Sequence, residues 1–226
     1  WWFNLFWLVL QSTKYRLNPT CDPYFGCNGL VNKYLIQNEV SGFLCDDDND
    51  WFKYLEKINN AFTQVAIDYS EVLANEMRLA WQNNKNIYFC GNGGSAAMAS
   101  HVAVDLTKAA GCRAITFNEA DLLTCFANDY GYENWVEKAF HFYADKGDVV
   151  ILISSSGTSK NIINGANWAK KNGLKVITLS GFNSDNPLRI IGDINLWVDS
   201  KGYNIVEMAH HIWLVAIVDY IVGNIE

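Results

Sequence analysis

The most apolar run of the sequence is too short to cross a membrane. Its most apolar stretch, WWFNLFWLVL, occupies only residues 1–10, whereas a membrane-spanning helix needs about 20 residues. Three roles stay open for this stretch: the end of a secretory signal, an anchor at a membrane surface, or a buried hydrophobic segment. The sequence therefore predicts no membrane span.

Positive charge is also scarce. The chain has 17 lysines and arginines against 24 aspartates and glutamates, which gives a formal net charge of −7. Proteins that bind nucleic acid usually present a basic face to its phosphates. Nucleic acid is therefore not an expected partner.

The six cysteines lack the spacing of a metal-binding motif. Cys90 falls in a predicted core strand and Cys125 in a predicted helix, which indicates reduced thiols and a cytoplasmic protein. Cys21 and Cys27 leave open a disulfide or a pair of metal ligands. We expect neither to organise the fold.

Length and composition predict one main domain. The chain has 226 residues, half of them hydrophobic, which is enough for one globular core. Regular patterns begin near Asp50. We therefore predict an N-terminal extension of unclear structure at residues 1–50 and a single domain, with helices at its start, at residues 51–226.

Strand and helix patterns alternate along this domain. Two helices, or one kinked helix, are predicted over residues 51–81. Five strands are predicted at residues 87–90, 113–117, 149–154, 175–180 and 194–198, and helices follow GNGGS and lie at residues 120–127, 134–143, 161–171 and 206–222. This order predicts an α/β fold, a doubly wound parallel five-stranded sheet flanked by helices.

A glycine-rich turn follows the first predicted strand. GNGGS at residues 91–95 precedes a helix that we expect Ser95 to cap. Because a helix N-terminus attracts anions, Asn92, Gly93 and Ser95 are candidate phosphate ligands. The alternative is a tight turn without a ligand. The turn is neither GxGxxG nor a Walker loop, so no nucleotide cofactor is expected.

Hydroxyl side chains follow the third predicted strand. Ser154, Ser155, Ser156, Thr158 and Ser159 surround Gly157 just before a helix. Hydroxyls and helix amides donate hydrogen bonds to phosphate, although hydroxyls can also cap their own turn. Both turns end strands of one parallel sheet, so we expect them to converge on one pocket.

Together with CFANDYGYE at residues 125–133, these motifs resemble the sugar isomerase (SIS) domain family over residues 51–225. The chain is similar to its phosphoheptose isomerase group, which includes sedoheptulose 7-phosphate isomerases of heptose biosynthesis and non-catalytic relatives. The resemblance implies a flavodoxin-like sheet, a phosphorylated sugar as ligand, and a homo-oligomer, commonly a tetramer. It places Asn128 and Asp129 near the sugar.

Two pairs of side chains suit proton transfer or metal binding. His101 and Asp105 lie four residues apart on one predicted helix, as do Glu207 and His211 on another. The resemblance implies that these four could hold zinc, and that Asp105 with His210 or His211 transfers the proton of an enediol mechanism. His210 or His211 could instead be a hydrogen-bonded core histidine.

The chain departs from the family at two positions. Asp105 stands where the resembled isomerases have glutamate, and Val215 stands where they have their catalytic histidine. Two functions therefore stay open. One is an isomerase of sedoheptulose 7-phosphate or a similar ketose phosphate, and the other is a non-catalytic phosphosugar sensor or oligomeric adaptor.

Overall fold

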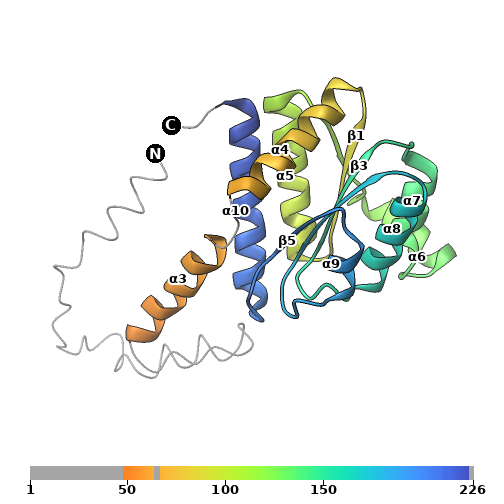
Figure 1. Cartoon of the computed structure of the whole chain (residues 1–226). Coiled ribbons are helices and arrows are strands. Elements are labelled where there is room, and N and C mark those ends of the chain that lie inside the picture. The colour runs from red at the N-terminus through yellow and green to blue at the C-terminus, as the bar shows by residue number, and fades with distance from the viewer. Residues whose placement is uncertain (1–47, 64–66, 224–226) are drawn as a thin grey trace, which may run out of the picture. The chain divides into compact units, whose positions relative to one another are not determined.

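The computed structural model describes residues 48–63 and 67–223 (Figure 1). The sequence-based predictions for the WWFNLFWLVL segment and for Cys21 and Cys27 lie outside these residues. By its internal contacts the chain divides into two units, Trp1–Lys53 and Tyr54–Glu226. The first described helix, α3 (Asp48–Phe62), begins in the first unit, and α4 (Ile67–Gln82) lies wholly in the second. The sheet and its remaining helices belong to the second unit.

Five parallel strands form the sheet, in the order β2-β1-β3-β4-β5. They are β1 (Asn86–Cys90), β2 (Arg113–Thr116), β3 (Val149–Ser154), β4 (Lys175–Ser180) and β5 (Ile194–Trp197). Chain order reverses between β1 and β3, where Ile87 pairs with Val149. The predicted doubly wound parallel sheet is confirmed. Ligands of such sheets bind where the order reverses, beyond the carboxyl ends of the strands.

Helices cover both faces of this sheet (Figure 1). On one face lie α4, α5 (Gly94–Ala110) and α10 (Tyr203–Val222). On the other lie α6 (Ala120–Tyr130), α7 (Trp135–Tyr143), α8 (Lys160–Lys171) and the short α9 (Pro187–Ile191). The sequence did not predict α9, because one turn of helix is too short to show a hydrophobic period.

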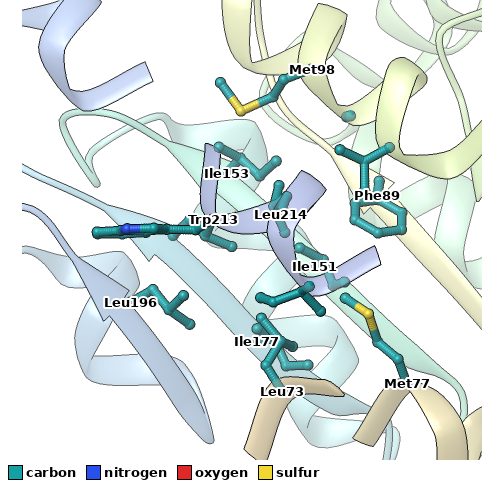
Figure 2. Packing of buried hydrophobic residues seen from close by; sticks show 14 of the residues in the cluster. Leu73, Met77, Phe89, Met98, Ile151, Ile153, Ile177, Leu196, Trp213 and Leu214 are labelled. Atoms are coloured by element: carbon teal, nitrogen blue, oxygen red, sulfur yellow. The ribbon is translucent and has the colours of Figure 1, made fainter. Parts of the chain in front are cut away.

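The central strand β3 explains why there are two hydrophobic clusters. All six of its residues are buried, and successive side chains point to opposite faces. Ile151 and Ile153 join the cluster under α4, α5 and α10, while Val150 and Leu152 join the cluster under α7 and α8. Figure 2 shows the first cluster, in which Leu214 of α10 lies over these strand residues.

The prediction that Ser95 caps α5 is wrong. Gly93 occupies the N-cap position with a φ of 55°, and no side chain there makes a capping bond. Ser95 instead lies in the first helical turn, is buried, and its N–H donates to Asn92 O at 3.0 Å. The positive φ favours glycine, so the cap falls two residues earlier.

The long helix α10 is apolar because much of it is core. Among the described residues it is the one helix long and apolar enough to cross a membrane, with a mean hydropathy of 1.6. Seven of its residues are buried, and six of them, among them Val206, Trp213, Leu214 and Ile217, pack into the cluster beneath α4 and α5. A core helix of a globular protein passes the same test.

Candidate functional site

The two predicted loops meet at the carboxyl ends of β1 and β3. Asn92, after β1, and Asn161, at the start of α8, form a reciprocal amide pair. Asn92 Nδ2 donates to Asn161 Oδ1 at 3.0 Å, and Asn161 Nδ2 donates to Asn92 Oδ1 at 2.9 Å. The predicted convergence of the GNGGS and SSSGTS segments is thus present in the fold.

The β3–α8 loop presents its hydroxyls around the start of α8. Ser154 Oγ donates to Ser159 Oγ at 3.0 Å, and the hydroxyls of Ser156 and Thr158 lie 2.8 Å apart. Ser154 and Ser155 are buried, whereas Ser156, Thr158 and Ser159 are partly or fully open to solvent. The open hydroxyls stand beside the helix N-terminus, where an anion gains from the helix amides.

Gly157 and Asn186 hold this loop in shape. Gly157 has a φ of +67°, and a Cβ there would lie 2.0 Å from Asn186 Oδ1. The buried Asn186 side chain donates to Ser180 Oγ at 3.0 Å and accepts from Arg189 N at 3.0 Å. Leu188 N donates to Gly157 O at 3.1 Å. The unpredicted helix α9 therefore supports the loop from behind.

A carboxylate covers the first turn of α5. A Cβ on Gly94 would lie only 2.1 Å from Glu207 Oε2, so the Glu207 side chain rests directly on this glycine. Burial raises the pKa of Glu207, and a hydrogen bond from Ser155 works in the opposite direction. Glu207 thus ties α10 to the β3–α8 loop and puts an acidic group where α5 begins.

One turn further along, His101, Asp105 and His211 form a cluster between α5 and α10. His101 Nδ1 lies 2.8 Å from His211 Nε2, and His101 Nε2 lies 3.1 Å from Asp105 Oδ2. The His211 ring is half-buried, and burial followed by the neighbouring His101 lowers its pKa. Val215, one turn beyond His211 on α10, has no group that can transfer a proton. His211 is therefore the histidine of α10 that contacts α5.

His210 points the other way, into the core. It has no exposed surface, its Nε2 lies 3.1 Å from Ser180 O, and burial lowers its pKa to about 4. Because a backbone carbonyl can only accept, Nε2 carries a proton, and the lowered pKa keeps the ring neutral near pH 7. The structure favours the core alternative for His210 and leaves Asp105 and His211 as the candidates for proton transfer.

The four predicted metal ligands do not converge on one point. His101 and His211 direct ring nitrogens at each other, and Glu207 is bonded to Ser155. In the part of the chain that the structure describes, no three His, Cys, Asp or Glu side chains are arranged to share a metal ion. Histidine and carboxylate side chains are suitable zinc ligands, but the positions of these four side chains do not fit a zinc ion. Zinc binding stays a prediction.

Asn128 and Asp129 lie in the last turn of α6, which is longer than predicted. Both are exposed; Asn128 Nδ2 donates to Asp129 Oδ1 at 2.9 Å, and Cys125 Sγ lies 3.7 Å from Asp129 Oδ2. Their contact with a sugar stays a prediction. From the same sequence motif, it is Tyr132 that reaches the loops, with its hydroxyl 3.1 Å from Asn92 Oδ1.

Sequence reasoning did not find Tyr132, Asn161 or Asn186. Tyr132 lies inside the CFANDYGYE motif, and Asn161 lies in the first turn after the hydroxyl loop. Their places in the sequence therefore made both of them candidates, but indicated no role for either. Asn186 gave no signal beyond the asparagine that often precedes a helix. Each acts across elements distant in sequence, which a local pattern does not reveal.

The chain is similar in sequence and fold to known phosphoheptose isomerases. The chain is 33% identical over 162 residues to a phosphoheptose isomerase of Maridesulfovibrio salexigens, covering 69% of this chain and 76% of the relative. It is 34% identical over 165 residues to a probable phosphoheptose isomerase of Thermoplasma acidophilum, covering 70% and 90%. The solved phosphoheptose isomerase of Neisseria gonorrhoeae superposes with a TM-score of 0.71 at 25% identity, covering 78% of this chain and 98% of that one.

The family model of the SIS domain matches residues 50–181, which is more than half of the chain. This stretch contains all three motifs on which the resemblance was based. The chain belongs to the SIS domain family.

Proposed function

We propose that the chain is an aldose–ketose isomerase that acts on sedoheptulose 7-phosphate or a similar ketose phosphate through an enediol. Relatives that are named phosphoheptose isomerases, at 33% and 34% identity, support this assignment. The observation that carries it is the Asn92–Asn161 amide pair, which joins the turn before α5 to the start of α8. The hydroxyl loop, which can bind an anion, and the helix that bears His101 and Asp105 therefore belong to one site.

The two ends of this site differ in charge, and this orients the substrate. Glu207 covers the start of α5, whereas the start of α8 is ringed by the hydroxyls of Ser156, Thr158 and Ser159. A phosphate dianion is repelled by a carboxylate and attracted by helix amides and hydroxyls. The phosphate therefore binds at α8, and the carbonyl end of the sugar extends towards α5 and α10.

The cluster between α5 and α10 supplies the base. If His101 Nε2 donates to Asp105, the neutral His101 ring can only accept at Nδ1, so His211 must donate its Nε2 proton there. His211 Nδ1 is then left as a proton acceptor. Asp105 acts through His101, and this relay compensates for a carboxylate shorter by one methylene group than glutamate. His211 takes the role that Val215 cannot perform.

A homotetramer, a cytoplasmic location and a zinc ion belong to the same proposal. Exposed apolar side chains on α4, such as Val72 and Leu79, favour an interface with another copy of the chain. Zinc would bind only if the rings of His101 and His211 separated, because their nitrogens now bond to each other. Adding zinc to the assay below tests whether it raises or lowers activity.

Proton exchange tests the isomerase directly. Sedoheptulose 7-phosphate is incubated with the full chain in D2O, with and without zinc, and deuterium uptake at the carbon next to the carbonyl is followed by NMR. We expect uptake by the wild-type chain and a loss of about 100-fold or more in Asp105→Asn, because the amide no longer fixes the His101 ring through which His211 is held as the base, and a general base contributes about 10²–10⁴-fold. His141→Gln, which removes an exposed histidine of α7, should retain the wild-type rate.

Calorimetry separates binding from turnover. We expect Ser156→Ala and Ser159→Ala each to weaken sedoheptulose 7-phosphate binding by about 1.5 kcal/mol or more, the worth of a hydrogen bond to a charged group. Unchanged affinity would exclude the phosphate assignment. Binding by the wild-type chain with no deuterium uptake over hours would instead support the non-catalytic sensor or adaptor.

A further inference from the structure

The side chain of Tyr132 bridges two loops that the proposed chemistry does not connect. Tyr132 lies between α6 and α7, and its ring is 52% exposed. Its hydroxyl donates to Asn92 Oδ1 at 3.1 Å, in the turn between β1 and α5. A half-exposed tyrosine gives up freedom to make this contact, so the question is what the contact does for Asn92.

The hydrogen bonds of the Asn92 side chain are nearly all assigned. Asn92 Oδ1 accepts from both Tyr132 and Asn161, which uses both of its lone pairs. Asn92 Nδ2 donates one of its two hydrogens to Asn161 Oδ1. Asn161 itself is only 2% exposed, so its end of the pair is fixed in the protein interior. The second Asn92 hydrogen remains for a ligand.

The two hydrogen bonds between Asn92 and Asn161 do not by themselves determine that Asn92 presents an N–H group to the ligand. If both amide groups turned over together, Asn92 Nδ2 would donate where Oδ1 now accepts, and both bonds between the asparagines would be preserved. Asn92 would then present a carbonyl oxygen to the ligand instead of an N–H group. The two arrangements differ at Tyr132, because a phenol hydroxyl is a good donor and a poorer acceptor.

We propose that Tyr132 is a positioning residue that holds the Asn92 amide with its N–H group facing the phosphosugar. Sugar hydroxyls and phosphate oxygens accept such a bond, whereas a carbonyl oxygen in the same place would repel a phosphate. The inference rests on the binding half of the proposed function. It assigns Tyr132 no contact with the reacting atoms.

Tyr132→Phe removes the donor and keeps the ring. We expect the Kd and KM for sedoheptulose 7-phosphate to rise about five-fold, the worth of about one hydrogen bond, while kcat changes less than about two-fold. In an Asn92→Ala background, Tyr132→Phe should have no further effect, because the group it orients is gone. Tyr130→Phe, at an exposed tyrosine two positions earlier, is the matched control and should match the wild-type chain.

A measurement without substrate separates this inference from the enzyme assignment. In the ¹⁵N-labelled full chain, the side-chain NH2 signals of Asn92 should shift or split in Tyr132→Phe and stay in place in Tyr130→Phe. These signals, and the Kd, report on Tyr132 even if the wild-type chain turns over no sugar. An unchanged Asn92 signal, or a Tyr132→Phe effect that persists in Asn92→Ala, would overturn the proposal.

Discussion

Gly94 leaves room for a charged side chain from the far end of the sequence. A Cβ at this position would lie 2.1 Å from Glu207 Oε2 and 2.8 Å from its carboxyl carbon. Both atoms belong to the mobile end of a long side chain, so the carboxylate can move aside and the helix can stay intact. Glycine at position 94 is therefore needed to leave space for the Glu207 carboxylate, whereas the helix itself does not need it.

Gly94→Ala should reduce function without reducing stability. The added methyl group displaces the Glu207 carboxylate from the start of α5, and we expect kcat/KM to fall about ten-fold or more, since small displacements of the groups that orient a substrate are costly. Alanine is a better helix former than glycine, so the melting temperature should stay the same or rise slightly. Steady-state kinetics and thermal melting of the same preparation check both halves.

Two further variants show whether the effect runs through Glu207. In a Glu207→Ala background, Gly94→Ala should cause no further loss, because the displaced group is absent. Gly165→Ala is the contrasting case, since its methyl group would lie 2.5 Å from Val136 Cγ1 in the core. That variant should lose stability. A matching loss of stability in Gly94→Ala would contradict the assignment.

Residue chemistry made part of the site predictable. His101, Asp105 and His211 could be named from their spacing because titratable groups four apart share a helix face. Tyr132 and Asn161 could not, because their importance lies in a bond network that joins the β1–α5 loop, the α6–α7 loop and α8. Such a network depends on the assembled sheet and leaves no periodic trace in the sequence.

At the scale of single elements, α10 shows what local sequence patterns can and cannot predict. A long apolar helix was predicted from the sequence and is present, as Tyr203–Val222. His210 and His211 are neighbours, about 100° apart around the helix, and identical in chemistry. Only the packing of α10 decides that His210 faces Ser180 and that His211 faces His101. The sequence alone does not show which of the two histidines faces the core and which faces α5.

His210 should make the protein less stable in mild acid. Burial lowers its pKa to about 4 in the folded chain from the ordinary histidine value of 6.5. Between these values the unfolded chain binds more protons than the folded one, so stability is lost as the pH falls from 6.5 towards 4. One such group contributes a slope of up to about 1.4 kcal/mol per pH unit.

Urea unfolding between pH 7.5 and pH 4.5 measures this slope. His210→Gln keeps an N–H group that can reach Ser180 O and removes the titration, so the slope should become shallower by roughly 1 kcal/mol per pH unit. His141→Gln controls for the loss of a histidine at the surface. Equal slopes in the wild-type chain and His210→Gln would show that the buried ring is not the source.

For the whole molecule, the alternation of elements was the most reliable signal. All five predicted strands occur, and the order β2-β1-β3-β4-β5 follows from right-handed crossovers on both faces. Because ligands of such sheets bind at the reversal of strand order, the position of the site could be predicted before any side chain was placed. The strand order does not predict how the loops contact one another, since these contacts are hydrogen bonds between side chains.

The outer surface of α4 carries exposed apolar side chains that the fold of one chain does not explain. Its inner side, with Leu73, Ala74 and Met77, is fully buried, but Val72 is 46% and Leu79 is 51% exposed. These two exposed residues are seven apart and so lie on the same side of the helix. An apolar stripe of this kind on a core helix is typical of a contact between subunits.

We expect the full chain to sediment as an oligomer, with a tetramer favoured, and Leu79→Glu to shift it towards smaller species. A carboxylate placed in an apolar interface loses its water without gaining a partner, which costs several kcal/mol per contact. Asn167→Glu, on the exposed surface of α8, adds the same charge elsewhere and should sediment like the wild-type chain. If the wild-type chain sediments as a monomer at micromolar concentration, the oligomer prediction is wrong. If it is oligomeric and Leu79→Glu does not change it, the interface lies on another surface.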